Sequence, residues 1–73
     1  MATAENIKKV KTLLADNFDK KEEGISGTDK LDDIISANQS LFIAKMKEDH
    51  GIEVSDSDIE KLSTVEDAAG LLP

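Results

Sequence analysis

Residues 54–72 read VSDSDIEKLSTVEDAAGLL and carry two helix starts in close succession. The first lies at Ser55 and Asp56, which are residue types that favour a helix N-terminus. A short acidic helix is predicted to follow, with Ile59 and Leu62 as its apolar residues.

The second helix start is predicted at Ser63, because Glu66 lies three residues later and gives the spacing of a capping box. In that motif the serine hydroxyl and the glutamate carboxylate each accept a hydrogen bond from the other residue's backbone N–H. A last helix would then run towards Pro73. Its apolar face is predicted to consist of Val65, Ala68, Leu71 and Leu72.

Residues 4–18 form the clearest amphipathic pattern of the chain. Thr3 is a suitable N-cap for this helix, and Asp19 with the charged cluster after it marks the end. Lysines occupy the positions between the apolar ones. The apolar residues recur at spacings of three and four, at Ile7, Val10, Leu14 and Phe18.

A long connection follows over residues 20–35, where Gly24 and Gly27 stand among charged and small residues. Apolar residues nevertheless recur along it, so it is predicted to pack onto the domain rather than to extend into solvent. These apolar anchors are Ile25, Leu31, Ile34 and Ile35.

The second helix is predicted to begin at Ser36, because Gln39 follows at capping-box spacing and Ile35 supplies an apolar residue before the cap. Gly51 is typical of its C-terminus. Its buried stripe is predicted to contain Phe42, Ile43 and Met46.

Four helices account for the chain, and no alternating pattern typical of a strand competes with them. The predicted fold is all-α, a small four-helix bundle with a long loop between the first two helices and a short third helix. Residues 1–73 are predicted to form a single domain.

The net charge of −7 comes from one third of the chain. Residues 1–47 hold eight acids and eight lysines, whereas residues 48–73 hold eight acids and a single lysine, Lys61. Negative charge repels nucleic acid phosphate, which argues against nucleic-acid binding and favours basic protein partners. Without an apolar run near the roughly 20 residues of a membrane-spanning helix, the chain is predicted to be a soluble, cytoplasmic monomer that does not insert into membranes.

Catalytic residue types are scarce. The chain has no cysteine, which excludes a thiolate metal site and a cysteine nucleophile, and its single histidine is His50. His50 lies four residues after Met46 on the predicted apolar stripe, so a structural role is favoured. Asp56-Ser57-Asp58 starts like a calcium loop but lacks the glycine and the closing glutamate of one. We therefore predict a protein that is not an enzyme and holds no metal.

A hydroxyl at a helix start suits a phosphate-linked group. The first-turn N–H groups and the positive end of the helix dipole both favour an anion there. Ser36 is the candidate, although a serine at this position is more often a simple N-cap. Spacing alone therefore favours the capping role and leaves attachment open.

Two segments carry a resemblance to a known family. FIAKMKEDHGIEV at residues 42–54 is similar to the second helix and following loop of acyl carrier proteins, and the tail at residues 54–72 resembles their third helix and the start of their fourth. Glu22-Glu23 followed by Ile25 also resembles the end of the family's first loop. The resemblance is strong over residues 42–69 and weak over residues 20–41.

The resemblance implies a serine that carries 4'-phosphopantetheine. A count back from the tail without a gap puts this serine at Ser36, although Ile35-Ser36-Ala37 replaces the family's Asp-Ser-Leu. Counting forward from Leu31 leads instead to Ser40, which keeps a leucine after it. We favour Ser36, because the Ser40 register would put Lys47 at a core position, where burial of a charge is costly.

The resemblance further implies a carrier of acyl thioesters for fatty acid, polyketide or related synthesis. Its partners would be a phosphopantetheinyl transferase and acyl-transferring or synthase enzymes with basic docking patches. An alternative is an unmodified carrier-like module that docks on a basic partner through its acidic C-terminal third. The residues that the resemblance implies around an acyl chain are Phe42, Ile43, Met46, Val54, Ile59, Leu62 and Ala68, each of which is more simply a core residue.

Overall fold

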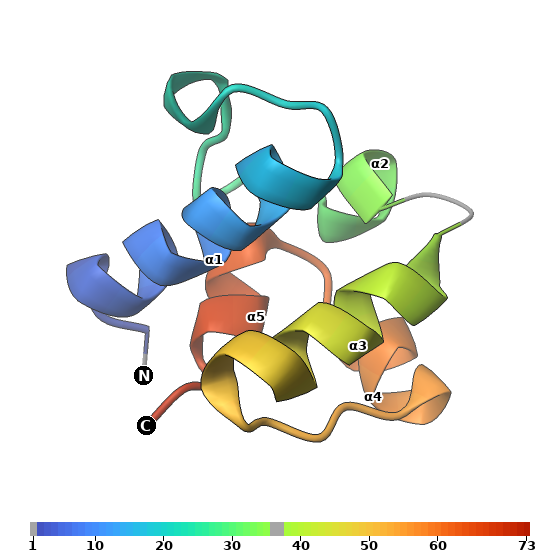
Figure 1. The fold of residues 1–73 in the computed structure, drawn as a ribbon. Coiled ribbons are helices and arrows are strands. Elements are labelled where there is room, and N and C mark those ends of the chain that lie inside the picture. Colours follow the sequence, from blue (N-terminus) through green and yellow to red (C-terminus); the bar gives the residue numbers. More distant parts are fainter. Residues whose placement is uncertain (1, 36–37) are drawn as a thin grey trace.

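The structure is a computed structural model that describes residues 2–35 and 38–73 (Figure 1). The described chain contains the α-helices α1 (Ala4–Asn17), α2 (Leu31–Ile35), α3 (Gln39–His50), α4 (Asp56–Lys61) and α5 (Val65–Ala69), and the 3-10 helix η1 (Glu22–Gly24). The prediction of an all-α fold is confirmed. The predicted number of four helices is too low, because the described residues include α2, a fifth α-helix within the expected loop.

Helix α1 begins and ends as predicted. The hydroxyl of Thr3 accepts a hydrogen bond from the backbone N–H of Asn6 at 3.1 Å, so Thr3 is the N-cap. At the other end the Phe18 N–H donates to the Leu14 carbonyl at 2.9 Å, and Asp19 then adopts a positive φ of 54°. This left-handed backbone conformation turns the chain out of the helix, because a residue with a positive φ cannot continue a right-handed α-helix.

The long connection is fastened to the start of α5 through its backbone. The N–H of Leu31 donates a hydrogen bond to the Ser63 carbonyl at 3.1 Å. In the other direction, two N–H groups at the start of α5 donate to carbonyls of the connection: Val65 to Asp29 at 3.0 Å, and Glu66 to Gly27 at 2.9 Å. The prediction that this segment packs onto the domain is therefore confirmed.

The apolar anchors of the connection explain why α2 forms. Leu31 and Ile35 lie four residues apart, so one turn of helix points both side chains into the core, where each is only 1% exposed. Ile25 is also buried, and Ile34 is partly buried.

Helix α3 begins later than predicted. Its N-cap is Asn38, whose carbonyl accepts the first helical hydrogen bonds from Leu41 at 3.2 Å and Phe42 at 3.4 Å. The predicted helix start at Ser36 is thus too early, because Gln39 is already the first helical residue. Ser36 itself lies outside the described residues. Gly51 ends the helix as predicted, with a φ of 68° that favours glycine.

Helices α4 and α5 both begin with a capping box. Ser55 forms one with Asp58, which confirms the predicted start of α4. The box of α5 consists of Thr64 and Asp67, one residue later than the predicted pair of Ser63 and Glu66. The shift arises because the Ser63 carbonyl is bound to the α2 backbone, which holds Ser63 before the helix.

The two capping carboxylates have lowered pKa values. The backbone N–H of Ser63 donates to the Asp67 carboxylate at 2.9 Å and that of Thr64 donates at 3.1 Å, and these bonds hold the pKa of Asp67 below its ordinary value of 3.8. Hydrogen bonds from Ser55 do the same for the pKa of Asp58. Because the folded-state pKa is depressed, each carboxylate stabilises the fold above its unfolded-state pKa, and this contribution is lost as the pH falls through the folded-state value.

Asp67→Asn is accordingly expected to lower the melting temperature at neutral pH. At a pH well below 3.8, the ordinary pKa of the carboxyl group, the same substitution should lower the melting temperature much less. The physical reason is that an amide is a weaker acceptor for two N–H groups at a helix start. Thermal unfolding followed by circular dichroism at both pH values measures the difference. Glu66→Gln, which removes a neighbouring charge but no capping bond, is the control, and an equal loss of melting temperature in both variants would contradict the explanation.

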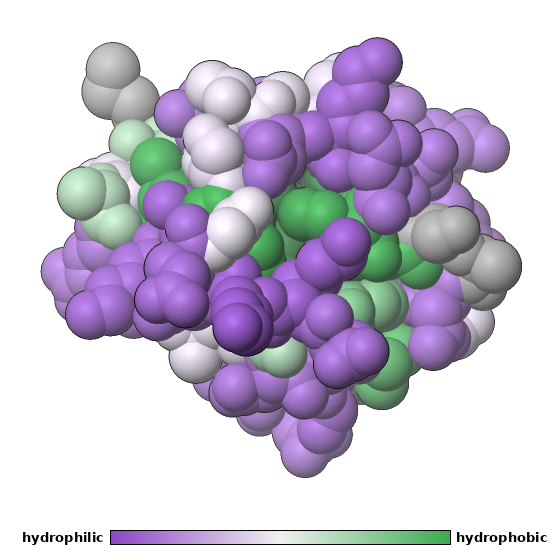
Figure 2. All heavy atoms as spheres, turned by 90° about the horizontal axis from the view of Figure 1, so that it is seen from above, coloured by the Kyte–Doolittle hydropathy of each residue, from purple (hydrophilic) through white to green (hydrophobic). Residues whose placement is uncertain are grey.

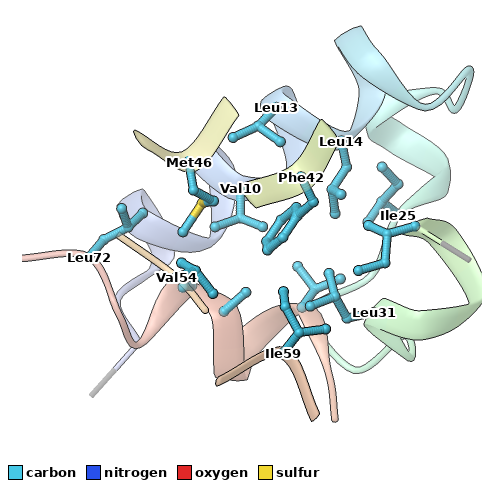
Figure 3. Packing of buried hydrophobic residues seen from close by; sticks show 14 residues of the cluster. Val10, Leu13, Leu14, Ile25, Leu31, Phe42, Met46, Val54, Ile59 and Leu72 are labelled. Atoms are coloured by element: carbon cyan, nitrogen blue, oxygen red, sulfur yellow. The ribbon is translucent and has the colours of Figure 1, made fainter. Parts of the chain in front are cut away.

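A single apolar core joins the helices. Helix α1 makes its most extensive contacts with α5, and it also contacts α3 (Figure 1). Figure 3 shows the Phe42 ring pointing into the middle of the cluster. Leu71 was predicted on the core face but is 38% exposed, whereas Ala69 and Leu72 are buried. The reason is that α5 ends at Ala69, so the helical periodicity no longer applies to Leu71.

Polar side chains dominate the outside of the molecule. Figure 2 shows hydrophilic side chains over most of one face, with apolar ones visible in the gaps between them. Asn6 is a buried polar residue that the sequence did not reveal, and its amide donates to the Leu72 carbonyl at 3.4 Å and the Pro73 carbonyl at 3.3 Å. These bonds tie the C-terminal end of the chain to α1.

Candidate functional site

The two candidate serines lie on either side of the start of α3. Ser36 falls outside the described residues, between the buried Ile35 at the end of α2 and the exposed N-cap Asn38. Ser40 is the second residue of α3 and is exposed. Ser36 therefore belongs to the connection between α2 and α3, whereas Ser40 belongs to the first turn of α3.

The start of α3 differs from the starts of α1, α4 and α5. Side chains cap α1, α4 and α5, whereas Asn38 makes no side-chain hydrogen bond to the first turn of α3. The first N–H groups of a helix have no partner within the helix, and the dipole adds partial positive charge there. The start of α3 is thus chemically suited to a nearby phosphodiester.

A surface hollow of about 300 Å³ opens beside this helix start, between α2 and α4. Its apolar side chains come from both helices and from the residue after α4, and its polar side chains stand at Asp32, Gln39 and Glu60. The apolar lining residues are Leu31, Ile35, Ile59 and Leu62.

The predicted acyl-chain residues divide into three places. Phe42, Met46 and Ala68 are fully buried in the core. Ile59 and Leu62 line the hollow beside the start of α3. Ile43 and Val54 line a second surface hollow, of about 440 Å³, between α3 and the segment leading to α4.

Sequence reasoning missed Leu31 and Ile35 as lining residues of the first hollow. Both were predicted as apolar anchors of the long connection, but anchoring alone does not tell which space a side chain faces. Their spacing of four, combined with a helical turn, was the available signal.

The register of α3 bears on the choice between the serines. Phe42 and Met46 are fully buried and Ile43 is partly buried, as the Ser36 register requires. The side chain of Lys47 is 68% exposed and pairs with Glu53 at 3.3 Å. The Ser40 register would need Lys47 in the core, and the position of Lys47 is unfavourable to it.

His50 lies at the last turn of α3 and is partly buried, in agreement with its predicted structural role. It lines a hollow against α1 with side chains that include Leu13 and Asp16. Within residues 2–35 and 38–73, no group of three or more histidine and acidic side chains is placed to hold a metal ion. No helix among these residues has the length and apolarity that crossing a membrane requires.

Comparison with known proteins adds a relative. No protein-family model matches the chain. A curated protein of Lactobacillus acidophilus named acyl carrier protein is 32% identical over an alignment of 75 residues, which covers 99% of this chain and 94% of that protein. The similarity therefore extends over nearly the whole of both sequences.

Proposed function

This chain belongs to the acyl carrier protein family, and on that premise we propose that it carries acyl groups as thioesters on a phosphopantetheine arm attached to Ser36. The observation that supports the proposal most strongly is the core register of α3, with Phe42 and Met46 fully buried and Lys47 outside. That register favours Ser36 over Ser40 as the attachment site.

Attachment requires one displacement. The hydroxyl oxygen of Ser36 forms a bond to the phosphorus of the phosphopantetheine half of coenzyme A, the pyrophosphate P–O bond breaks, and adenosine 3',5'-bisphosphate leaves. The hydroxyl proton passes to a base of the transferase or to water. The chain's own contribution is a serine three residues before Gln39, the first residue of α3, because the partial positive charge at a helix start favours the phosphodiester that forms.

The hollow between α2 and α4 offers a place for the start of an acyl chain. Gln39, the first residue of α3, lines this hollow, and Leu31, Ile35 and Ile59 give it an apolar wall. A longer chain would have to displace core side chains, of which Phe42, Met46 and Ala68 are the predicted ones. The hollow of about 300 Å³ would by itself shelter only a short acyl group.

The remaining chemistry belongs to partners. A phosphopantetheinyl transferase would load the arm, and acyl-transferring or synthase enzymes of fatty acid, polyketide or related synthesis would charge and discharge it. We propose that the carrier itself acts as a cytoplasmic monomer.

The carrier function is tested by acylation. The loaded protein is incubated with an acyl-coenzyme A and an acyltransferase, and its intact mass is measured before and after neutral hydroxylamine. We expect the mass to rise by one acyl group and hydroxylamine to remove that group while leaving the arm, because a thioester is cleaved and a phosphodiester is not. An acyl group that resists hydroxylamine would contradict a thioester.

A further inference from the structure

We propose that the Asp67 carboxylate is a positioning group for the acyl site, because it fixes the corner at which the two walls of the hollow between α2 and α4 meet. A short acyl group would stay sheltered in the hollow only while this corner is held. The inference rests on the proposed function and names a residue that does not itself line the hollow.

The two walls of the hollow meet at Ser63. Leu31 begins α2 and lines one wall, and Leu62 follows α4 and lines the other. Figure 3 shows Leu31 and Ile59, one from each wall, close together on one side of the cluster. Ser63 directly follows Leu62, and its carbonyl accepts a hydrogen bond from the Leu31 N–H at 3.1 Å. The backbone of Ser63 therefore joins both walls.

The Asp67 carboxylate holds Ser63 from the side of α5. One of its oxygens accepts hydrogen bonds from the N–H of Ser63 at 2.9 Å and from the N–H of Thr64 at 3.1 Å. Hydrogen bonds to an ionised acceptor are roughly twice as strong as those between neutral groups. The Ser63 N–H is thus bound by α5 and its carbonyl by α2, so that the position of this residue is fixed from two sides.

The bond between Leu31 and Ser63 is the one through which the start of α5 acts on the hollow. Two other backbone bonds join the long connection to α5, and they end at the carbonyls of Asp29 and Gly27. Neither Asp29 nor Gly27 lines the hollow, whereas Leu31 does.

Removal of the carboxylate is expected to make the corner open more often. A reagent in solution reaches a sheltered group when the structure opens locally, so the reaction rate follows the population of the open form. The loss of one capping interaction changes such a population by about fivefold. Asp67→Ala should therefore expose an acyl group in the hollow about fivefold more often.

The test measures how fast neutral hydroxylamine cleaves a butanoyl thioester on the folded carrier. A broad-specificity phosphopantetheinyl transferase attaches the butanoyl arm from butanoyl-coenzyme A, and intact mass follows the loss of the butanoyl group with time. We expect the wild-type carrier to be cleaved more slowly than butanoyl-coenzyme A. Asp67→Ala is expected to be cleaved about fivefold faster than the wild type.

Two further variants separate positioning from general stability. Thr3→Ala removes the hydrogen bond that caps α1, at 3.1 Å from the Asn6 N–H, and Thr3 does not line the hollow. Asp67→Glu keeps a carboxylate at the third helical position, which is where a capping box commonly has glutamate. Both variants are expected to protect the butanoyl group like the wild type, and circular dichroism checks that each variant is folded.

The length of the acyl group provides a second readout. An acetyl group has little apolar surface to place in the hollow, so its cleavage is expected to be equally fast in the wild type and in Asp67→Ala. A purely structural loss would instead speed cleavage of both thioesters by the same factor, and that result would overturn the inference.

The remaining outcomes separate this inference from the proposed function. Equal cleavage of the butanoyl group in Asp67→Ala and Thr3→Ala would overturn the role of Asp67, and so would a wild type cleaved as fast as butanoyl-coenzyme A. In both cases the carrier function would stand, because the arm and its thioester would still be present. A wild type that no transferase loads would refute the proposed function and this inference with it.

Discussion

Ser36→Ala is expected to abolish attachment of the phosphopantetheine arm. Alanine has no hydroxyl oxygen to attack the pyrophosphate of coenzyme A and release adenosine 3',5'-bisphosphate, and no other group of the chain is proposed to replace it. The variant is incubated with coenzyme A and a phosphopantetheinyl transferase, and its intact mass should remain that of the unmodified chain.

Ser40→Ala is the matched control and is expected to be loaded like the wild type. Both variants are expected to retain α3, because this helix begins at Gln39 with Asn38 as its N-cap. Trypsin cuts after Lys30 and Lys45, so residues 31–45 form one peptide that contains both serines. Fragmentation of this peptide names the modified residue, and an arm found on Ser40 would reverse the assignment.

Phe42→Ala is expected to cost about 3–5 kcal/mol of unfolding free energy. Phe42 is fully buried and is among the largest completely buried side chains, so its removal leaves a cavity in the middle of the core as well as losing apolar burial (Figure 3). The free energy of unfolding of a native domain is roughly 5–15 kcal/mol in total, and a chain of 73 residues is expected towards the lower end of this range. The variant should therefore be largely unfolded or unfold at very low urea concentration.

The other phenylalanine of the chain provides the control. Phe18 is only partly buried, against the edge of the core at the end of α1, so Phe18→Ala removes the same atoms from a site that solvent already reaches. Urea denaturation followed by circular dichroism measures both variants. A loss for Phe42→Ala no larger than that for Phe18→Ala would contradict the central position given to Phe42.

The predictable elements were those with a complete local signal. Helix α1 has an apolar stripe over several turns and a threonine at its N-cap, and its bounds were predicted to within a residue. Gly51 ends α3 because a positive φ suits glycine, which is a property of the residue itself. The start of α4 at Ser55 likewise depends on a capping box contained within four residues.

The elements that were missed depend on contacts between distant segments. Helix α2 spans only five residues, too few to show a helical period, and it forms where the backbone at Leu31 meets Ser63. The same contact places the cap of α5 at Thr64 instead of Ser63. The local sequence of residues 31–35 does not distinguish a short helix from a loop, and that of residues 63–67 does not distinguish a cap at Ser63 from one at Thr64.

For the candidate site, the sequence supplied two candidate serines and a set of apolar residues but not their arrangement. Ile59 and Leu62 were predicted around an acyl chain, and they line the hollow together with Leu31 and Ile35, whose part in it depends on α2. The uncharged first half of α3 could be read from the sequence. Its position next to Glu60 could not, because it depends on how α4 packs.

The most direct test of the carrier assignment is the intact mass of the wild-type protein after incubation with coenzyme A and a broad-specificity phosphopantetheinyl transferase. We expect the mass to rise by one phosphopantetheine arm. A mass that stays that of the bare chain, with a known carrier protein loaded in the same reaction, would contradict the account and leave a carrier-shaped module that binds its partners without an arm.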